Sequence, residues 1–362
     1  MTNMNQIPWK LVQNKFPYYP GGREIDKFRG VDPPKDDNSP ECWVGSDTTM
    51  RYAVRYGEPT RGLAKVVLPD GRTEWIRDVI QADPEAILGP EHVKAEGDKL
   101  GVLVKLLDAQ EQLGLQCHPD RDFAKRVFDS DYGKEESWYV IGTRDDTKEP
   151  PYVLMGFKEG VTREVFEEAY HREDLAAMEG CCHKVPAKVG DVFMISAGLP
   201  HAIGAGCFVI EVQEPSDYTV GVGPAPKELS AEDKARFEEA VLGCYHYDGH
   251  SYEENLRLHC PEPRTLREGS WGSEKLIIGP GDTDYFSFTR LDASAPVKLL
   301  DVHAAQVGIV LEGEGKLITP EGELALSKAD EFFLTYSCKD VTLVPEDGGT
   351  ISLVLCKPQI FD

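Results

Sequence analysis

Four residues of this chain have the types and the spacing of a metal site. Gln116 and His118 lie two apart in the strand-like run LGLQCHPD, so their side chains are predicted to share one face of a sheet. Glu136 follows in GKEESWYVI, and His201 ends VGDVFMISAGLPH, where a strand leads into a glycine turn. Two imidazoles and a carboxylate suit a divalent ion such as zinc, and the Gln116 oxygen can complete the shell.

This ligand set would also support a reaction. One carboxylate neutralises only one of the two charges of the ion, so the ion stays positive and can polarise a carbonyl and stabilise an enediolate. The spacing alone leaves a second interpretation open, because an isolated histidine is usually a hydrogen-bonded structural or surface residue.

Four segments occur in order along the chain: LLDAQEQLGLQCHPD, GKEESWYVI, VGDVFMISAGLPHAIGAG and VIEVQEPSDYT. Together they resemble the signature segments of class I mannose-6-phosphate isomerases (phosphomannose isomerases) of the shorter, bacterial kind. The resemblance runs from about Pro8 into the final β-rich part. It implies a cupin enzyme that interconverts mannose 6-phosphate and fructose 6-phosphate, an intramolecular oxidoreductase acting through a metal-stabilised cis-enediol.

The resemblance also implies roles for individual residues. The ligands of one zinc ion per chain would be Gln116, His118, Glu136 and His201. Glu211 would be the active-site carboxylate, and Lys105 a lysine that both binds substrate and takes part in catalysis. Asp217 and Lys227 would bind substrate as well. These roles agree with the chemistry, because moving a proton between adjacent carbons needs a base and a positive charge beside the enediolate.

Two positions depart from the family pattern. Gly114 stands where the family has serine, and Gly221 where it has arginine. An arginine binds phosphate through two parallel hydrogen bonds, whereas glycine offers only its backbone. The alternatives are therefore an isomerase of a different or unphosphorylated sugar, or a catalytically weakened cupin that only binds a sugar.

The first part of the chain is predicted to combine strands with two helical segments. The runs YAVRY, LAKVVL and GVLVKLL, between residues 52 and 107, favour a meandering sheet. A helical insertion is predicted near 162–183, with Thr162 as its N-cap. Strands return at 191–195 and 207–212, and a helix capped by Ser230 is expected to close the first domain near Leu242.

The rest of the chain alternates in a β pattern after the loop CPEPRTLREGSWG. We therefore expect a mainly β protein with two cupin-like β-barrel or jelly-roll domains. Residues 1–245 would form the metal-binding catalytic domain with its helical insertion, and residues 246–362 a cupin-like domain without metal. His303 is the one histidine near its GIVLEGEGKL strand pair. His246 and His250 are predicted to be structural, because Asp-Gly between them favours a turn.

Composition limits the class of partner. A chain of 362 residues exceeds the usual size of one core, and its net charge of -24 disfavours nucleic acid and anionic lipid. No apolar run approaches the roughly 18 residues of a membrane span, and the N-terminus lacks the features of a secretory signal. Nine cysteines without a CxxC pair suggest reduced thiols. We expect a cytoplasmic enzyme for a small sugar or sugar phosphate, and the resemblance implies a monomer.

Overall fold

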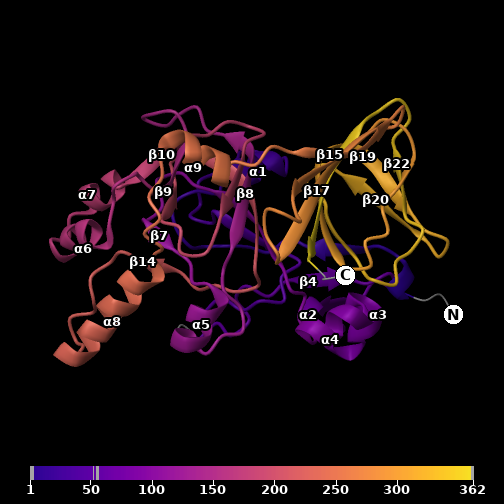
Figure 1. The fold of residues 1–362 in the computed structure, drawn as a ribbon. Coiled ribbons are helices and arrows are strands. Elements are labelled where there is room, and N and C mark those ends of the chain that lie inside the picture. Colours follow the sequence, from indigo (N-terminus) through magenta and orange to yellow (C-terminus); the bar gives the residue numbers. More distant parts are fainter. Residues whose placement is uncertain (1–3, 52, 54–56, 360–362) are drawn as a thin grey trace.

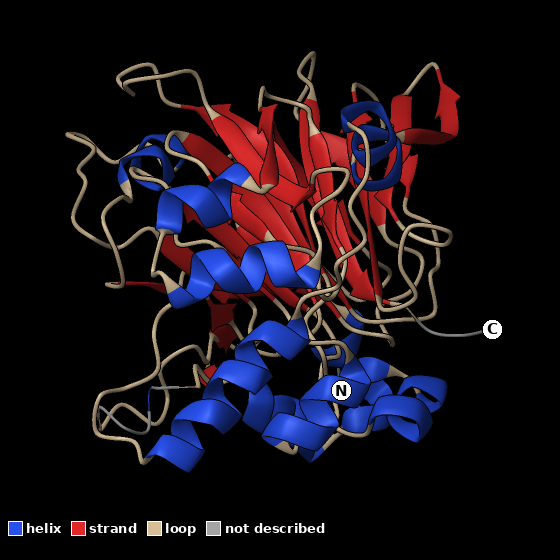
Figure 2. Ribbon diagram, turned by 60° about the vertical axis from the view of Figure 1, so that its left-hand side comes forward, coloured by secondary structure: helices blue, strands red, loops and turns tan. Residues whose placement is uncertain are grey.

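The structure is a computed structural model that describes residues 4–51, 53 and 57–359. It is mainly β, and Figure 1 shows two β-rich bodies side by side. In Figure 2 the helices lie around the outside of the strands.

Two antiparallel sheets make up the first body. They share a core that includes Leu107, Val140, Val153, Met155 and Val209. One sheet runs in the order β11 (Val192–Ile195), β8 (Glu136–Thr143), β13 (Cys207–Gln213), β6 (Leu103–Asp108), β3 (Glu41–Val44) and β2 (Lys15–Phe16). The other runs in the order β10 (Cys182–Pro186), β9 (Tyr152–Phe157), β12 (His201–Ile203), β7 (Gln116–Cys117) and β14 (Val220–Gly221).

The second body is built on one large antiparallel sheet. Its main path is β15 (Arg264–Gly269), β16 (Gly272–Ile278), β17 (Phe286–Ala293), β23 (Ile351–Pro358), β19 (Gln306–Ile318), β21 (Glu331–Leu334), β1 (Trp9–Val12), β4 (Lys65–Val67) and β5 (Thr73–Trp75). Off this path lie β18 (Val297–Lys298), β20 (Glu323–Ser327) and β22 (Thr342–Pro345). Strands from the start of the chain thus extend the C-terminal sheet, with Trp9 opposite Phe333. The division of the chain at residue 245 stays a prediction.

Two of the expected helical segments are confirmed. The insertion forms α6 (Arg163–His171) and α7 (Leu175–Gly180), and Thr162 accepts a hydrogen bond from the Val165 amide. Ser230 caps α8 (Ala231–Cys244) in the same way. The described residues also form η1 (Met4–Gln6), α1 (Arg23–Phe28), α5 (Arg121–Phe128) and α9 (Tyr252–His259), which were not predicted.

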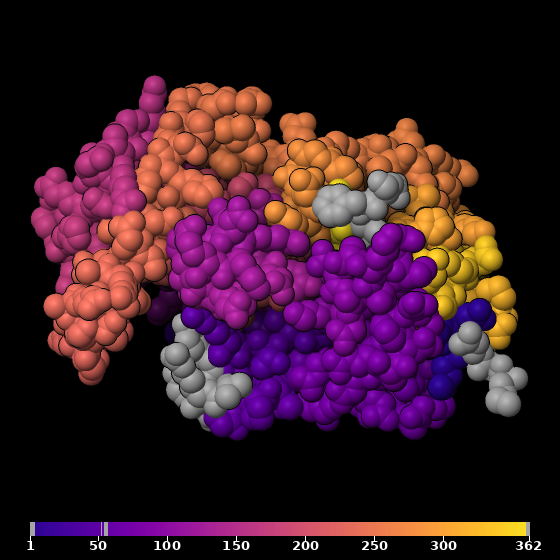
Figure 3. All heavy atoms as spheres, turned by 60° about the horizontal axis from the view of Figure 1, so that its bottom comes forward, coloured from indigo at the N-terminus to yellow at the C-terminus, as the bar shows by residue number. Residues whose placement is uncertain are grey.

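The predicted meander between residues 52 and 107 is wrong in its middle. The run LAKVVL contains β4 and GVLVKLL contains β6, but α2 (Ile76–Ala82), α3 (Pro84–Leu88) and α4 (Pro90–Glu96) lie between them. Pro84 and Pro90 each occupy a first helical position, where the missing N–H costs nothing. Figure 3 shows this purple segment as a continuous surface beside the yellow C-terminal body. The run YAVRY lies outside the described residues except for Ala53.

The predicted loop CPEPRTLREGSWG is also wrong in part, because it contains β15. Gly269 and Gly272 flank a tight turn, and β15 returns as a hairpin with β16. All nine cysteines are free thiols, as expected. Among the described residues, no helix has the length and apolar character to cross a membrane.

A buried ion pair joins the two bodies. Arg29, just after α1, lies 2.5 Å from Glu331 at the start of β21, and both side chains are almost fully buried. Burial raises the pKa of Glu331, and the adjacent Arg29 partly offsets that rise. The pair therefore depends on both partners being present.

Glu331→Ala is expected to lower the free energy of unfolding by about 3–5 kcal/mol, because it leaves Arg29 buried without a counter-charge. The control is Glu312→Ala, which breaks the exposed pair with Lys328 and should cost below about 1 kcal/mol. Denaturant titration of both variants measures the difference. Equal losses would show that the buried pair does not join the bodies.

Candidate functional site

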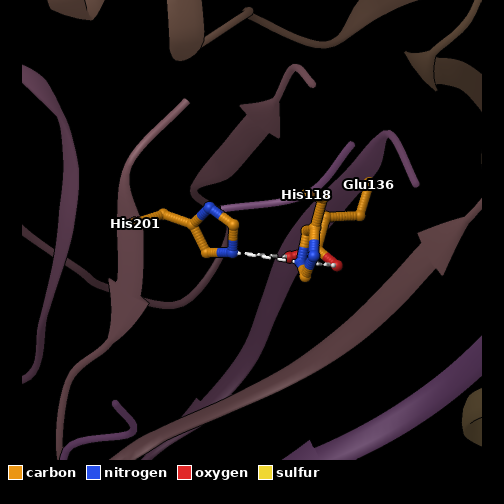
Figure 4. Close-up of side chains that lie close together, drawn as sticks. All are labelled: His118, Glu136 and His201. Atoms are coloured by element: carbon orange, nitrogen blue, oxygen red, sulfur yellow. Dashed lines mark hydrogen bonds and ion pairs between the residues drawn. The ribbon is translucent and has the colours of Figure 1, made fainter. Parts of the chain in front are cut away.

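Three of the four predicted ligands meet at one buried point. His118, Glu136 and His201 bring their ligand atoms within 4.8 Å of one another, and all three are buried (Figure 4). They come from three chain segments: the end of β7, the start of β8 and the start of β12. Gln116 lies opposite His201 in the strand register, and its amide nitrogen is 3.3 Å from His201 Nε2.

The two imidazoles present acceptor atoms to each other. Nδ1 of His118 lies 2.9 Å from the Tyr218 carbonyl, and Nδ1 of His201 lies 2.8 Å from the Leu199 carbonyl, which assigns the ring protons to Nδ1. The two Nε2 atoms then face each other as lone pairs at 3.1 Å. Burial lowers the pKa of His118 and of His201 to about 4, so both rings are neutral near pH 7.

Glu136 adds a third acceptor to this point. Its carboxylate oxygens lie 3.1 Å from His118 Nε2 and 3.6 Å from His201 Nε2. Burial raises the pKa of Glu136, but the Lys134 ammonium outweighs it and holds the pKa well below its usual value. The carboxylate is therefore ionised.

These residues fit a divalent cation. Two neutral imidazole nitrogens and a carboxylate present lone pairs to one point, and a rotation of the Gln116 amide would present its oxygen to the same point. Nitrogen and oxygen donors in this combination suit zinc. The Nδ1 hydrogen bonds fix both rings in the orientation that a metal ligand needs.

Lys134 is a further residue of this cluster that was not predicted from the sequence. Its ammonium is buried, 2.8 Å from His118 Nε2 and 2.5 Å from Glu136 Oε2. The available signal was its spacing, because residues 134 and 136 are two apart at the entry to a strand and share a face. Lys134 places a positive charge beside the ligand cluster.

A cavity of about 390 Å³ opens beside the cluster. Cross-strand pairing sets Trp138, Glu211 and Lys105 in one row along its floor, and Trp43 continues this row beyond the lining. Lys105 Nζ lies 2.7 Å from Glu211 Oε1. Burial lowers the pKa of Lys105, but Glu211 and nearby carboxylates outweigh it and raise the pKa above its ordinary value, so the lysine is charged.

The cavity includes most of the predicted substrate-binding residues. Its charged lining residues are Glu41, Lys105, Glu111, Lys134, Glu136, Glu211 and Asp217. Gly114 also lines it. Lys227 does not: it is exposed in the segment between β14 and α8.

Two further lining residues were missed, Glu41 and Tyr19. Glu41 is buried in β3 and accepts a hydrogen bond from Trp43 Nε1 at 2.8 Å. The signal for Glu41 was the pattern ECW, which places the carboxylate and Trp43 on one strand face. Tyr19 gave no such signal, because it precedes α1 in a segment without periodicity.

The remaining histidines lie elsewhere. His246 is exposed, 3.7 Å from Asp120, and His250 forms an isolated bridge with Lys158. His303 is exposed in the second body. In the part of the chain that the structure describes, neither His246 nor His250 belongs to a cluster with metal-ligand geometry.

Comparison with known families gives two matches. The model "Phosphomannose isomerase type I, catalytic domain" matches residues 12–139, and "Mannose-6-phosphate isomerase, cupin domain" matches residues 280–354. Together they cover more than half of the chain. The chain belongs to the type I phosphomannose isomerase family. The catalytic-domain match includes Gln116, His118 and Glu136.

Individual members of the phosphomannose isomerase family match over most of their length. The mannose-6-phosphate isomerase of Streptococcus mutans is 26% identical over 315 residues, which are 83% of this chain and 90% of that protein. The crystal structure of the mannose 6-phosphate isomerase from Bacillus subtilis superposes with a TM-score of 0.74 at 21% identity. The match covers 96% of this chain and 99% of that chain. A mannose 6-phosphate isomerase bound with zinc and yttrium superposes with a TM-score of 0.69 at 18% identity. That match covers 97% of this chain and 99% of that chain.

His201→Ala is expected to remove bound metal, because it takes one of the two imidazoles from the shell. Elemental analysis of purified protein measures the metal content. The control is His246→Ala, which should keep wild-type metal content. Full occupancy in the His201 variant would place the metal elsewhere.

Proposed function

We propose that the protein is an aldose–ketose isomerase that interconverts mannose 6-phosphate and fructose 6-phosphate. The observation that carries the proposal is the convergence of His118, His201 and Glu136 beside the Lys105–Glu211 pair in one cavity. A divalent ion held by Gln116 and these three ligands would supply a Lewis acid beside the sugar oxygens. Family membership supports the same reaction.

The residues of the chain would move the proton. Glu211 lies on the cavity floor, where its carboxylate can take a proton from one sugar carbon and return it to the neighbouring carbon. Lys105 remains protonated next to it and offers positive charge to the negative charge that develops on the substrate. Asp217 lines the same cavity and would bind a hydroxyl group.

A second candidate is an isomerase of an unphosphorylated sugar. Both lysines of the described lining already contact carboxylates, Lys105 that of Glu211 and Lys134 that of Glu136. Gly221 lies opposite Gln116 in the register, so an arginine there would point to the same face as this ligand. With glycine at position 221, a phosphate lacks the bidentate arginine side chain that the resemblance to the family implies here.

The cofactor and the architecture belong to the same proposal. We infer one zinc ion per chain, because the donor set suits zinc and a similar structure is described as zinc-bound. We infer two cupin-like barrels, the second without metal, acting as a cytoplasmic monomer on a small sugar. The net charge of -24 disfavours a nucleic-acid partner.

Glu211→Gln is expected to lower turnover by a factor of about 10²–10⁴, because the glutamine keeps the shape of the side chain and removes the base. Metal content and melting temperature should stay unchanged. A coupled assay with mannose 6-phosphate and, separately, free mannose measures the rate and tests the function of the wild type. Near wild-type turnover in the variant would show that another group moves the proton.

Gly221→Arg is expected to raise kcat/KM on mannose 6-phosphate, because it supplies the bidentate donor missing beside Gln116. The backbone allows the change: Gly221 has no positive φ, and an added Cβ would meet its nearest neighbour, the Leu115 carbonyl, at 3.9 Å. The control substrate is free mannose. A loss on free mannose without a gain on the phosphorylated sugar would instead favour the second candidate.

A further inference from the structure

Tyr19 has a polar atom at the cavity without a partner. Its ring packs against the core shared by the two sheets of the first body, and the residue lines the cavity. The hydroxyl is buried and lies close to the Glu41 carboxylate, but no hydrogen bond of good geometry satisfies it among the described residues. A buried hydroxyl without a partner is unfavourable, so its retention at a cavity wall is explained if a ligand completes the bond.

The surroundings make this hydroxyl a donor. Burial and the nearby carboxylates of Glu41 and Glu211 raise the pKa of Tyr19 well above its usual value, so the hydroxyl keeps its proton. One oxygen of Glu41 already accepts from Trp43 Nε1. A ligand oxygen beside Glu41 would therefore meet both an acceptor and the Tyr19 donor.

The backbone around Tyr19 is held in place. The Asp108 carboxylate accepts from the amides of Gly22 and Glu24, each at 2.8 Å, and Arg144 Nε donates to the same carboxylate at 2.8 Å. Gly21 has a φ of 144°, and a Cβ there would come within 2.2 Å of the Asp108 carbonyl. The wall that carries Tyr19 is preformed, which reduces the entropy lost on binding.

The sheet register places Glu41, the neighbour of Tyr19, beyond the reacting groups. On the floor, Glu136 pairs with Gln213 of β13. Glu211 lies two residues before Gln213 on the same strand, and so in the next row. Glu41 pairs with Leu107, two residues beyond Lys105 on β6. The Glu41 row is thus one side-chain row, about 6.6 Å, past the proton-transfer pair. A sugar whose reacting carbons lie at Glu211 presents its other hydroxyls to this row.

We propose that Tyr19 is a substrate-binding residue that selects the sugar: its hydroxyl donates a hydrogen bond to a non-reacting hydroxyl of the substrate, which in turn donates to Glu41. The role rests on the proposed function of the same cavity. It assigns recognition of the sugar to the segment before α1, apart from the residues that hold metal or move the proton.

The test is calorimetric titration of the zinc-loaded protein with mannose 6-phosphate, alongside steady-state kinetics. Tyr19→Phe removes only the hydroxyl, and is expected to raise Kd and KM about five- to tenfold with kcat, metal content and melting temperature nearly unchanged. Tyr336→Phe, in the second body, is the matched control and should change neither constant. Deoxy forms of the sugar phosphate extend the test. The form that lacks the hydroxyl bound by Tyr19 should bind the wild type more weakly than the full sugar does. The same deoxy form and the full sugar should bind Tyr19→Phe equally well.

Each outcome decides one question. Unchanged Kd in Tyr19→Phe, or a loss of kcat at unchanged KM, overturns the binding role. A wild type that binds mannose 6-phosphate without converting it refutes the proposed function, while the comparison of Kd values still decides the role of Tyr19. A wild type that neither binds nor converts the sugar phosphate overturns both.

Discussion

The Nε2 atoms of His118 and His201 face each other at 3.1 Å while both ring protons are committed to backbone carbonyls. Neither ring can donate to the other, and the ionised Glu136 adds a third acceptor. Burying three acceptors together is unfavourable unless a positive charge lies between them. Lys134 supplies one such charge to His118 and Glu136, but no contact joins it to His201. Gln116 Nε2 lies 3.3 Å from His201 Nε2 and offers a donor to that ring, and a divalent ion would meet all three acceptors at once.

Holding these acceptors together explains the arrangement of the first body. His201 and Gln116 come from one sheet and Glu136 from the other, so the sandwich must close for the cluster to exist. The same register that brings Glu136 to the edge of the cavity sets Trp138, Glu211 and Lys105 in the next row. Metal binding and proton transfer therefore share one rigid floor, and a shift of one residue in any of its strands would turn these side chains to the other face.

Local patterns were enough to predict the parts of the fold that depend on neighbours in sequence. Thr162 and Ser230 cap helices as expected, and β6, β13 and β19 follow the apolar runs. The errors arose where the pattern was ambiguous or the partner remote. Short apolar runs around Ile76 and Ile87 fit strand and helix alike. The pairing of β1 with β21 joins Trp9 to Phe333, and no local signal reports such a contact.

The site shows the same division. The ligands could be predicted because they lie in segments that resemble the signature segments of the family. Tyr19 could not, because its place in the cavity depends on Asp108, remote in sequence: the Asp108 carboxylate accepts from the amides of Gly22 and Glu24 and is itself bound by Arg144.

The residues proposed to carry out the reaction and those proposed to select the sugar also lie in different parts of the structure. The Lys105–Glu211 pair lies inside strands and the acceptor cluster lies at the ends of β7, β8 and β12, where register and packing restrict change. The two positions proposed to affect the choice of sugar, Gly221 and Tyr19, lie at the short edge strand β14 and in a segment outside the sheets. Because both positions lie outside the cluster, the choice of sugar could change there while the proposed reaction stays the same. Glycine at position 221, where the resemblance implies an arginine, would be a difference of this kind.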